Sequence, residues 1–261
     1  MESTVRVRNG EIWADDTGGD GPPLVLLHPG IADSGVWDRV VPELAPHHRV
    51  IRYDARGYGR SPAPTAAYSQ AEDLAAVLDH FGLDRAALAG TSMGGATAVS
   101  LALDAPDRVT ALALFCPGVT GRPDPDPPAL TQEIGTLARA GDMDGLVALA
   151  LRTWAAAGTA PDAKAADFVR RAIPAWFTTH PHQVPDAPAY DRLPALRPPC
   201  LIAITGLDQP EVVRCNEQMA ARIPDCRVVR LPDCDHLPSL REPGTVARLI
   251  LEACARGRGG V

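Results

Sequence analysis

The sequence is poor in lysine, has no paired-cysteine motif and contains no long apolar run. Lys164 is the single lysine among 25 basic residues, which face 32 acidic ones, and no basic patch typical of nucleic-acid binding is visible. No segment approaches the roughly 18 to 20 apolar residues of a membrane-spanning helix. Met1–Arg8 carries charges where a signal peptide needs an apolar core. We therefore expect no nucleic acid and no membrane among the partners.

The six cysteines follow neither a CxxC nor a zinc-type spacing. Disulfide frameworks belong to shorter secreted chains, so we predict reduced thiols and a cytoplasmic location. No metal-ligand constellation and no phosphate-binding loop stands out, and the sequence predicts neither a metal nor a cofactor. The cysteines are Cys116, Cys200, Cys215, Cys226, Cys234 and Cys254.

What the sequence does contain is a regular alternation of strand-like and helix-like segments. A chain of 261 residues with 46% apolar composition can bury a sizeable core. Asn9-Gly10 predicts a hairpin between the strands Thr4–Arg8 and Glu11–Asp16. Further strands are expected at Leu24–Leu27, Arg49–Tyr53, Ala86–Ala89, Val109–Phe115, Cys200–Thr205 and Arg227–Leu231, and helices at Gly35–Ala45, Ser69–Phe81, Met93–Asp104, Pro210–Arg222 and Gly244–Ala255. This pattern predicts an α/β fold with a mostly parallel central sheet.

One stretch, residues 118–199, breaks the alternation. It begins with the proline-rich run Arg122–Pro128 and ends near Pro198-Pro199, and no strand pattern lies between them. Amphipathic segments are expected near Ala129–Ala140, Asp144–Ala156 and Pro161–Phe177. We predict a core domain of residues 1–117 and 200–261 with a helical cap, or lid, of residues 118–199, although the prolines could also be ordinary loop residues.

The segment Gly90-Thr91-Ser92-Met93-Gly94 holds the motif Gly-x-Ser-x-Gly. An apolar strand runs into it and an alanine-rich helix leaves it, which is the context of a nucleophile elbow. So tight a turn strains the serine backbone and leaves no room for side chains at positions 90 and 94. We interpret Ser92 as a nucleophile; a glycine-rich helix start is the alternative.

A serine nucleophile needs a base and an acid that orients the base. His236 follows the last strand and Asp208 follows the strand before it, so both loops lie at the carboxyl edge of the sheet with Ser92. His236 could also be a solvated loop histidine. Asp233 and Asp235 are too close to His236 in the chain to fold back onto its ring, and we expect them to be solvated.

Acyl transfer also needs two N–H donors for the oxyanion. The residue after the nucleophile, Met93, supplies one backbone N–H. The loop His28-Pro29-Gly30 supplies the other, and because proline has no N–H, Gly30 is the expected donor. We expect His28 itself to brace this loop.

With these residues in place, the chain resembles an α/β-hydrolase-fold serine hydrolase over nearly its whole length. The markers include Leu26–Gly30, Asp54–Ser61, the Ser92 elbow, Gly206-Leu207-Asp208 and Asp235–Pro238. The resemblance implies the order Ser92, Asp208, His236 of that fold, and a structural rather than catalytic role for Asp54 and Arg56. Within this family, the sequence is most similar in its motifs to the 3-oxoadipate enol-lactonase and esterase branch. Two features depart from the family pattern. Pro29 stands where glycine is commoner in the family, and the loop before Asp208 is one residue shorter than in many relatives.

The resemblance implies a cofactor-independent hydrolase that cleaves a small carboxylic ester or lactone through an acyl-enzyme on Ser92. Thioesterases, C–C bond hydrolases, non-hydrolytic biosynthetic catalysts and binding proteins use the same fold and stay open as alternatives. The expected partner is a small acyl substrate, and the sequence does not predict an oligomeric state. Candidate pocket walls are Trp37, Met93, Trp154, Trp176 and Phe177, although the last three could equally pack within the cap.

Overall fold

One β-sheet runs through the middle of the computed structural model, which describes residues 1–122, 128–158 and 162–258. Within those residues it has eight strands in the order β1-β2-β4-β3-β5-β6-β7-β8. The pairs β1–β2 and β2–β4 are antiparallel and the other pairs are parallel. The predicted α/β class with a mostly parallel sheet is therefore confirmed. The strands are β1 (Glu2–Val7), β2 (Gly10–Asp16), β3 (Pro23–Leu27), β4 (Arg49–Tyr53), β5 (Ala86–Thr91), β6 (Val109–Phe115), β7 (Cys200–Thr205) and β8 (Cys226–Leu231).

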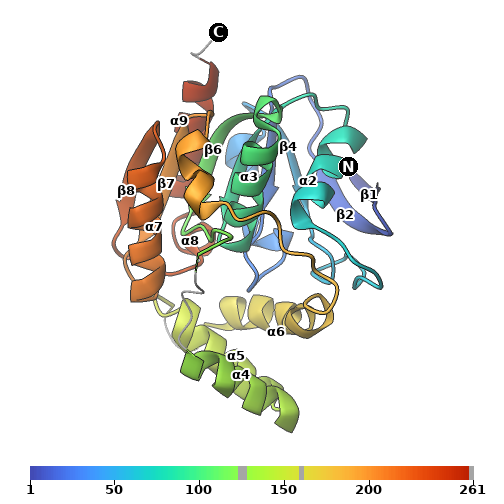
Figure 1. Cartoon of the computed structure of the whole chain (residues 1–261), viewed down its shortest axis with the longest axis vertical. Helices are drawn as coiled ribbons and strands as arrows, with labels where there is room; N and C mark the ends of the chain where they lie inside the picture. The colour runs from blue at the N-terminus through green and yellow to red at the C-terminus, as the bar shows by residue number, and fades with distance from the viewer. Residues whose placement is uncertain (123–127, 159–161, 259–261) are drawn as a thin grey trace.

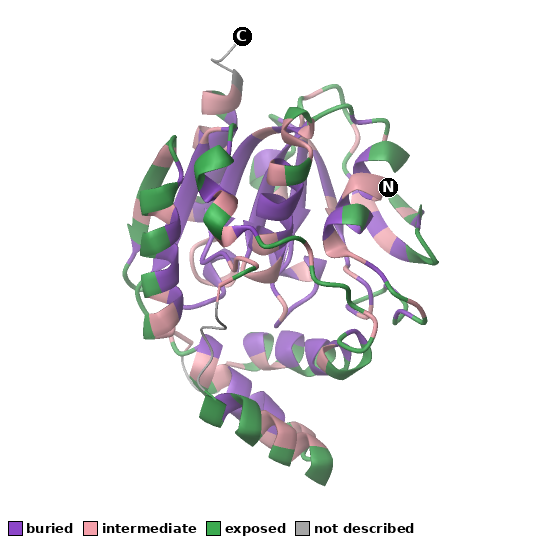
Figure 2. Ribbon diagram, viewed as in Figure 1, coloured by how far each residue is buried: buried purple, intermediate pink, exposed green. Residues whose placement is uncertain are grey.

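Helices cover both faces of this sheet because its central strands are apolar on both sides. In β3, Leu24 and Leu26 belong to one hydrophobic layer, whereas Val25 and Leu27 belong to the other. Figure 2 shows the central strands buried and the outer helix surfaces exposed. One face carries α2 (Gln70–His80), α3 (Met93–Asp104) and α7 (Pro210–Arg222), which lie in front of the sheet in Figure 1. The other carries α1 (Val41–Leu44) and α9 (Pro243–Arg258).

The helix expected over Gly35–Ala45 is wrong in one respect, since it is broken in two. A 3₁₀ helix, η1 (Ser34–Trp37), is followed by the short α1. Pro42 lies in the first turn of α1. Because proline has no N–H to bond the preceding turn, a continuous helix cannot run through it. The remaining short elements are η2 (Pro106–Arg108), η3 (Tyr190–Ala195) and α8 (Pro238–Arg241).

Three helices between β6 and β7 lie together beyond one end of the sheet (Figure 1). They are α4 (Pro128–Ala140), α5 (Met143–Trp154) and α6 (Ala163–Thr178), called the cap helices below. The described part of 118–199 adds no strand to the sheet, in agreement with the predicted helices; positions 123–127 of the proline-rich run and Pro161 lie outside the described residues. The division into a core and a cap at 118 and 199 stays a prediction.

The cap helices are joined to the rest of the molecule by polar contacts as well as apolar packing. Arg171 of α6 forms an ion pair with Asp33 at 2.9 Å, and Trp176 Nε1 donates to the carbonyl oxygen of Gly30 at 2.7 Å. Phe168 of α6 shares a hydrophobic cluster with Trp37 beneath it. None of the helices, in the described ranges, is long and apolar enough to cross a membrane.

The loop after β4 has the structural role that the sequence implied. Asp54 accepts hydrogen bonds from the N–H groups of Ser34 at 2.8 Å and Arg60 at 2.9 Å, so it joins two loops. Arg56 forms a buried ion pair with Asp73 at 2.7 Å. Neither Asp54 nor Arg56 lines the cavity that contains Ser92.

Candidate active site

The turn between β5 and α3 holds Ser92 in a strained backbone conformation. Its φ is +50° and its ψ is −111°, a region that residues with a Cβ rarely adopt. A Cβ on Gly90 would lie 2.6 Å from the backbone of Gly94, and a Cβ on Gly94 would lie 2.5 Å from the carbonyl oxygen of Leu27. The helix packs so closely on the sheet here that only glycine fits at both positions, as predicted.

The loops after β7 and β8 bring Asp208 and His236 together. His236 Nδ1 lies 2.5 Å from Asp208 Oδ2. The same carboxylate accepts from the Thr205 hydroxyl at 3.1 Å and from the Gln209 N–H at 2.8 Å. The His236 side chain is 7% exposed and that of Asp208 is 0% exposed. The shorter loop before Asp208 therefore still reaches the histidine.

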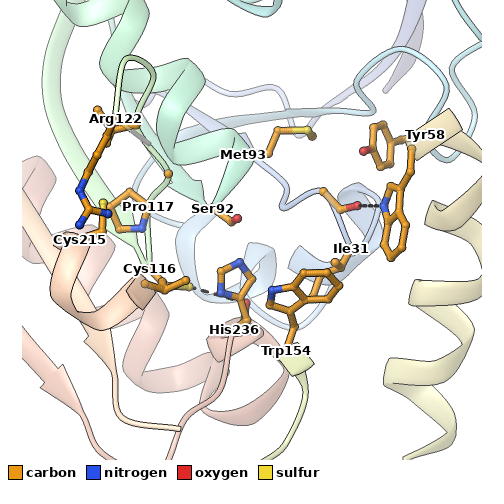
Figure 3. A pocket seen from close by; sticks show the side chains of 15 residues that line it. Ile31, Tyr58, Ser92, Met93, Cys116, Pro117, Arg122, Trp154, Cys215 and His236 are labelled. Carbon is orange, nitrogen blue, oxygen red and sulfur yellow. Dashed lines mark hydrogen bonds between the residues drawn. The ribbon is translucent and has the colours of Figure 1, made fainter. Parts of the chain in front are cut away.

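The ring of His236 stands beside the Ser92 side chain in Figure 3, and both residues line one cavity. Because Nδ1 faces Asp208, the other ring nitrogen is left to take a proton from a neighbouring hydroxyl. A histidine oriented in this way can serve as the base of a serine nucleophile; that His236 does so stays a prediction.

Burial and charge act in opposite directions on His236. Burial by itself lowers the pKa of His236, but the sulfur of Cys116 and the charge and hydrogen bond of Asp208 raise it well above 6.5 overall. Cys116 can act on His236 through charge only as a thiolate, and burial raises the pKa of this thiol. Near pH 7 the negative charge beside His236 is therefore that of Asp208. The pair thereby stabilises the imidazolium that forms when a histidine accepts the serine proton.

Cys116 is a neighbour of the site that sequence reasoning missed. It follows β6 with a φ of +36°, and its Sγ lies 3.7 Å from the carbonyl oxygen of His236. Its place at the end of a parallel strand, like those of Ser92 and Asp208, was the available signal.

Cys116, Asp208 and His236 also offer three potential metal ligands within 4.8 Å of one another. Two ligand atoms on one tetrahedral zinc would be roughly 3.3 Å apart, given zinc–nitrogen and zinc–oxygen bonds near 2 Å. The 2.5 Å between His236 and Asp208 is too short for that and fits a direct hydrogen bond.

The loop after β3 is braced by His28, as predicted. His28 Nε2 accepts from the Ala55 N–H at 3.0 Å, so Nδ1 carries the proton and donates to the Pro29 carbonyl at 2.9 Å. The Ala32 N–H donates to the same carbonyl at 3.2 Å. Because the C=O and N–H of a trans peptide point in opposite directions, the N–H of Gly30 faces away from these donors.

Gly30 and Met93 border the cavity together with Ser92. Met93 is the first residue of α3, so its N–H has no partner one turn earlier in the helix. Gly30 is also held through its own carbonyl by Trp176. Both backbone donors are thus placed around one space, and their part in binding an oxyanion stays a prediction.

The cavity has a volume of about 270 Å³. Trp154 and Trp176 line it, with their rings edge-to-face at 5.9 Å. The predictions for Trp37 and Phe177 as walls are not met. Trp37 is 0% exposed and packs against Phe115 in the core, whereas Phe177 is 43% exposed and is not among the residues that line the cavity.

Two further wall residues, Tyr58 and Arg122, escaped prediction. Tyr58 belongs to the loop after β4 and Arg122 to the segment after β6. Each residue type is common in loops, so no local pattern distinguishes these two positions from ordinary surface residues.

The expectation of a solvated Asp235 is wrong. Its side chain is 0% exposed and forms an ion pair with Arg241 at 2.6 Å. It also accepts from the N–H of Ala157, which follows α5, at 3.0 Å. Next to it, the N–H of His236 donates to the carbonyl of Trp154 at 3.1 Å. The segment after α5 thus holds the loop that carries His236.

A family model described as alpha/beta hydrolase fold matches residues 22–190. A 2-hydroxy-6-oxo-2,4-heptadienoate hydrolase of Pseudomonas putida is 40% identical over 104 residues, which are 37% of this chain and 38% of that protein. A pimeloyl-[acyl-carrier protein] methyl ester esterase of Vibrio campbellii is 43% identical over 97 residues, 36% of each chain. The chain thus matches under two fifths of the length of these curated relatives.

A solved structure covers far more of the chain. Est816, described as an N-acyl homoserine lactone degrading enzyme, superposes with a TM-score of 0.79 and 28% identity over 99% of this chain and 100% of that one.

Proposed function

Because the chain belongs to the α/β-hydrolase fold family, we propose that it is a serine hydrolase that cleaves a small carboxylic ester or lactone. The observation that carries this proposal is the buried Asp208–His236 pair at 2.5 Å beside a serine held on a strained turn. A binding protein has no need for either feature.

In the proposed reaction, the Ser92 hydroxyl oxygen attacks the substrate carbonyl while its proton passes to His236. The carbonyl oxygen becomes an oxyanion near the N–H groups of Gly30 and Met93. When the tetrahedral intermediate collapses, the bond to the alcohol oxygen breaks and that oxygen takes the proton from His236. Water then attacks the acyl-serine by the same proton route and releases the carboxylic acid. Asp208 holds the histidine and stabilises its charged form throughout.

The dimensions of the cavity support a small substrate. Its volume of about 270 Å³ lies at the lower end of the roughly 300 to 1,000 Å³ typical of ligand sites. Trp154, Trp176 and Ile31 contribute apolar surface to its lining. Short acyl chains and small lactones fit this description.

C–C bond hydrolysis is the second candidate, since the Pseudomonas putida relative is named for a dienoate substrate of that class. Both reactions would use the same serine and histidine. They differ in the leaving group, which is an alcohol oxygen in one and a carbon in the other.

A substrate panel tests the proposal. Purified protein would be assayed with short acyl esters, lactones, thioesters and a 2-hydroxy-6-oxo-dienoate, for wild type and Ser92→Ala. We expect ester or lactone turnover that falls by on the order of 10⁴ to 10⁶ in kcat in the variant. Ser100→Ala removes a buried hydroxyl from the same helix and serves as the matched control. Turnover within tenfold of wild type in Ser92→Ala would refute the assignment, and turnover of the dienoate alone would favour the second candidate.

The cap formed by residues 118–199 is proposed to select the acyl group, because Trp154 and Trp176 belong to it. A cytoplasmic location also stays a proposal. It is supported by the six cysteines, all within the described residues, which are thiols rather than disulfides.

A further inference from the structure

Two cysteines lie next to each other on neighbouring strands, away from the cavity around Ser92. Cys200 and Cys226 are the first residues of β7 and β8, and the parallel pairing of these strands places them directly opposite each other. Cys200 belongs to one hydrophobic layer of the sheet, and Cys226 packs against the same layer. Neither residue lines the cavity. The two thiols therefore share one face of the sheet, at the amino ends of both strands.

The spacing of the two strands is compatible with a disulfide. Neighbouring strands lie about 4.8 Å apart, and the Cα atoms of a disulfide are usually about 4.4 to 6.8 Å apart. Because the two residues are opposite each other on one face, a bond between their sulfur atoms needs no change of strand register. Both cysteines are thiols in this structure, and Cys200 forms a hydrogen bond with Cys226 through their side chains.

The surroundings make Cys226 the more reactive thiol of the pair. Its pKa is lowered, mainly because Cys200 donates a hydrogen bond to its sulfur; the charge of Arg256 acts in the same direction, and burial opposes both. Arg256 is held there by Asp225 and by the carbonyl oxygen of Cys200, to which it donates at 3.1 Å. Cys226 is partly exposed, whereas Cys200 is fully buried. A partly exposed thiol beside a cation ionises and oxidises more readily than a buried one.

Three other cysteines lack these surroundings. Burial raises the pKa of Cys116, Cys215 and Cys234, so their thiolates are scarce near pH 7. Cys234 also lies 3.5 Å from a carboxylate oxygen of Glu242, whose negative charge opposes ionisation. Oxidation is therefore expected first at Cys226.

From this arrangement we propose that Cys200 and Cys226 are a reversible oxidation site, at which hydrogen peroxide converts the two thiols into a disulfide. The bond would fasten β8, the outer strand of the sheet, to β7 (Figure 1). The proposal does not depend on the hydrolysis of any substrate.

The oxidation takes two steps. The Cys226 thiolate attacks one oxygen of the peroxide, the O–O bond breaks, and a sulfenic acid forms; the hydroxide that leaves takes up the proton released by the thiol and becomes water. The Cys200 thiol then attacks the sulfenic sulfur, so that the S–S bond forms and the S–O bond breaks. The second oxygen leaves as water with the proton of the Cys200 thiol. The two thiols lose two electrons, and one peroxide becomes two waters.

Counting free thiols tests this proposal. Reduced, folded protein would be treated with a small excess of hydrogen peroxide, stopped with catalase, unfolded in guanidinium chloride and blocked with N-ethylmaleimide. Intact mass spectrometry should show four adducts per chain, because two of the six thiols are bonded to each other. Reduction with dithiothreitol before blocking should restore all six. Tryptic mapping without reduction should join the peptide that contains Cys200 to the peptide that contains Cys226.

Serine variants separate the roles of the two cysteines. Cys226→Ser should lose thiols to peroxide about tenfold more slowly than wild type, because the reactive thiol is gone. Cys200→Ser keeps a hydroxyl donor but cannot form the second bond, so dimedone should trap a sulfenic acid on Cys226. Cys215→Ser is the matched control, since it removes another buried cysteine from α7, between the two strands; it should form the disulfide as fast as wild type.

Oxidation of protein that is already unfolded shows whether the fold selects this pair. In guanidinium chloride the same peroxide treatment should give several pairings instead of one. Six adducts in peroxide-treated wild type, a disulfide between two other cysteines, or a dimedone adduct on Cys116 rather than Cys226 in Cys200→Ser would overturn the proposal. An equal preference for Cys200–Cys226 in folded and unfolded protein would overturn it as well.

Discussion

Arg241 links the cap helix α6 to the loop that carries His236. We predict that replacing Arg241 lowers the stability of the protein. Its guanidinium donates to Asp235 at 2.6 and 2.9 Å and to Asp162, the N-cap of α6, at 2.7 Å. Asp235 is fully buried, and Arg241 is only 16% exposed. Arg241→Gln would therefore leave a buried carboxylate whose described donors are two backbone N–H groups, those of Ala157 and Leu237.

The magnitude follows from the burial of this pair. Breaking a buried ion pair by removing one partner costs about 3 to 5 kcal/mol. Because glutamine can keep one hydrogen bond and two N–H donors stay in place, we expect the lower end, about 3 kcal/mol. With an unfolding entropy of roughly 2.1 cal/mol/K per residue, a chain of this length would melt about 5 °C lower.

Thermal unfolding followed by circular dichroism measures this shift directly. Arg152→Gln is the matched control, since it breaks a half-exposed pair with Glu133 between α4 and α5 and should change the melting temperature little. The double variant Asp235→Asn/Arg241→Gln removes both charges and should recover part of the loss. A melting temperature for Arg241→Gln within 2 °C of wild type would refute the reasoning.

Three other predictions concern the site. The rate kcat/KM should rise with pH through a midpoint above 6.5, because His236 must be neutral to accept a proton and its pKa is raised; a profile flat from pH 5 to 9 would contradict a histidine base. Asp208→Asn should lower kcat by about 10⁴-fold. It should also lower the midpoint of the remaining pH profile, because burial then lowers the pKa of His236 with no carboxylate to oppose it. A midpoint equal to that of wild type would contradict this cause. Trp154→Ala and Trp176→Ala should change kcat/KM for a bulky ester by tenfold or more relative to an acetate ester. Phe177 is exposed, so Phe177→Ala should affect both esters alike. If all three variants affected the two esters equally, the pocket would lie elsewhere.

The strands could be predicted because their signal is local. Arg49–Tyr53, Val109–Phe115 and Cys200–Thr205 are apolar runs that fall between turn residues, and the structure has the same bounds. The helix over Gly35–Ala45 was misjudged at Pro42, although the rule that proline interrupts a helix applies there as well.

The three proposed catalytic residues could be predicted because their assignment needs only their order in the chain and the strand that each one follows. Ser92, Asp208 and His236 all follow parallel strands, and the topology brings such loops to one edge of the sheet. The order of the strands themselves, with β3 between β4 and β5, was not needed for that conclusion.

The surroundings of the site could not be predicted because they depend on contacts between distant parts of the chain. Asp235 is buried by Arg241 and by Ala157, 78 positions away, and no local pattern indicates that partner. Trp37 and Trp176 are the same residue type, yet one lies in the core and the other in the cavity wall. Only the packing of the cap helices on the sheet distinguishes them.

The account depends most on Ser92 being the activated nucleophile, and labelling with a fluorophosphonate tests this most directly. Intact mass spectrometry of folded protein should show one adduct per chain, and peptide mapping should place it on Ser92. The adduct should be absent from Ser92→Ala and should form much more slowly in His236→Ala, because the serine then has no base. An unlabelled wild type, or an adduct on any residue other than Ser92, would contradict the central claim.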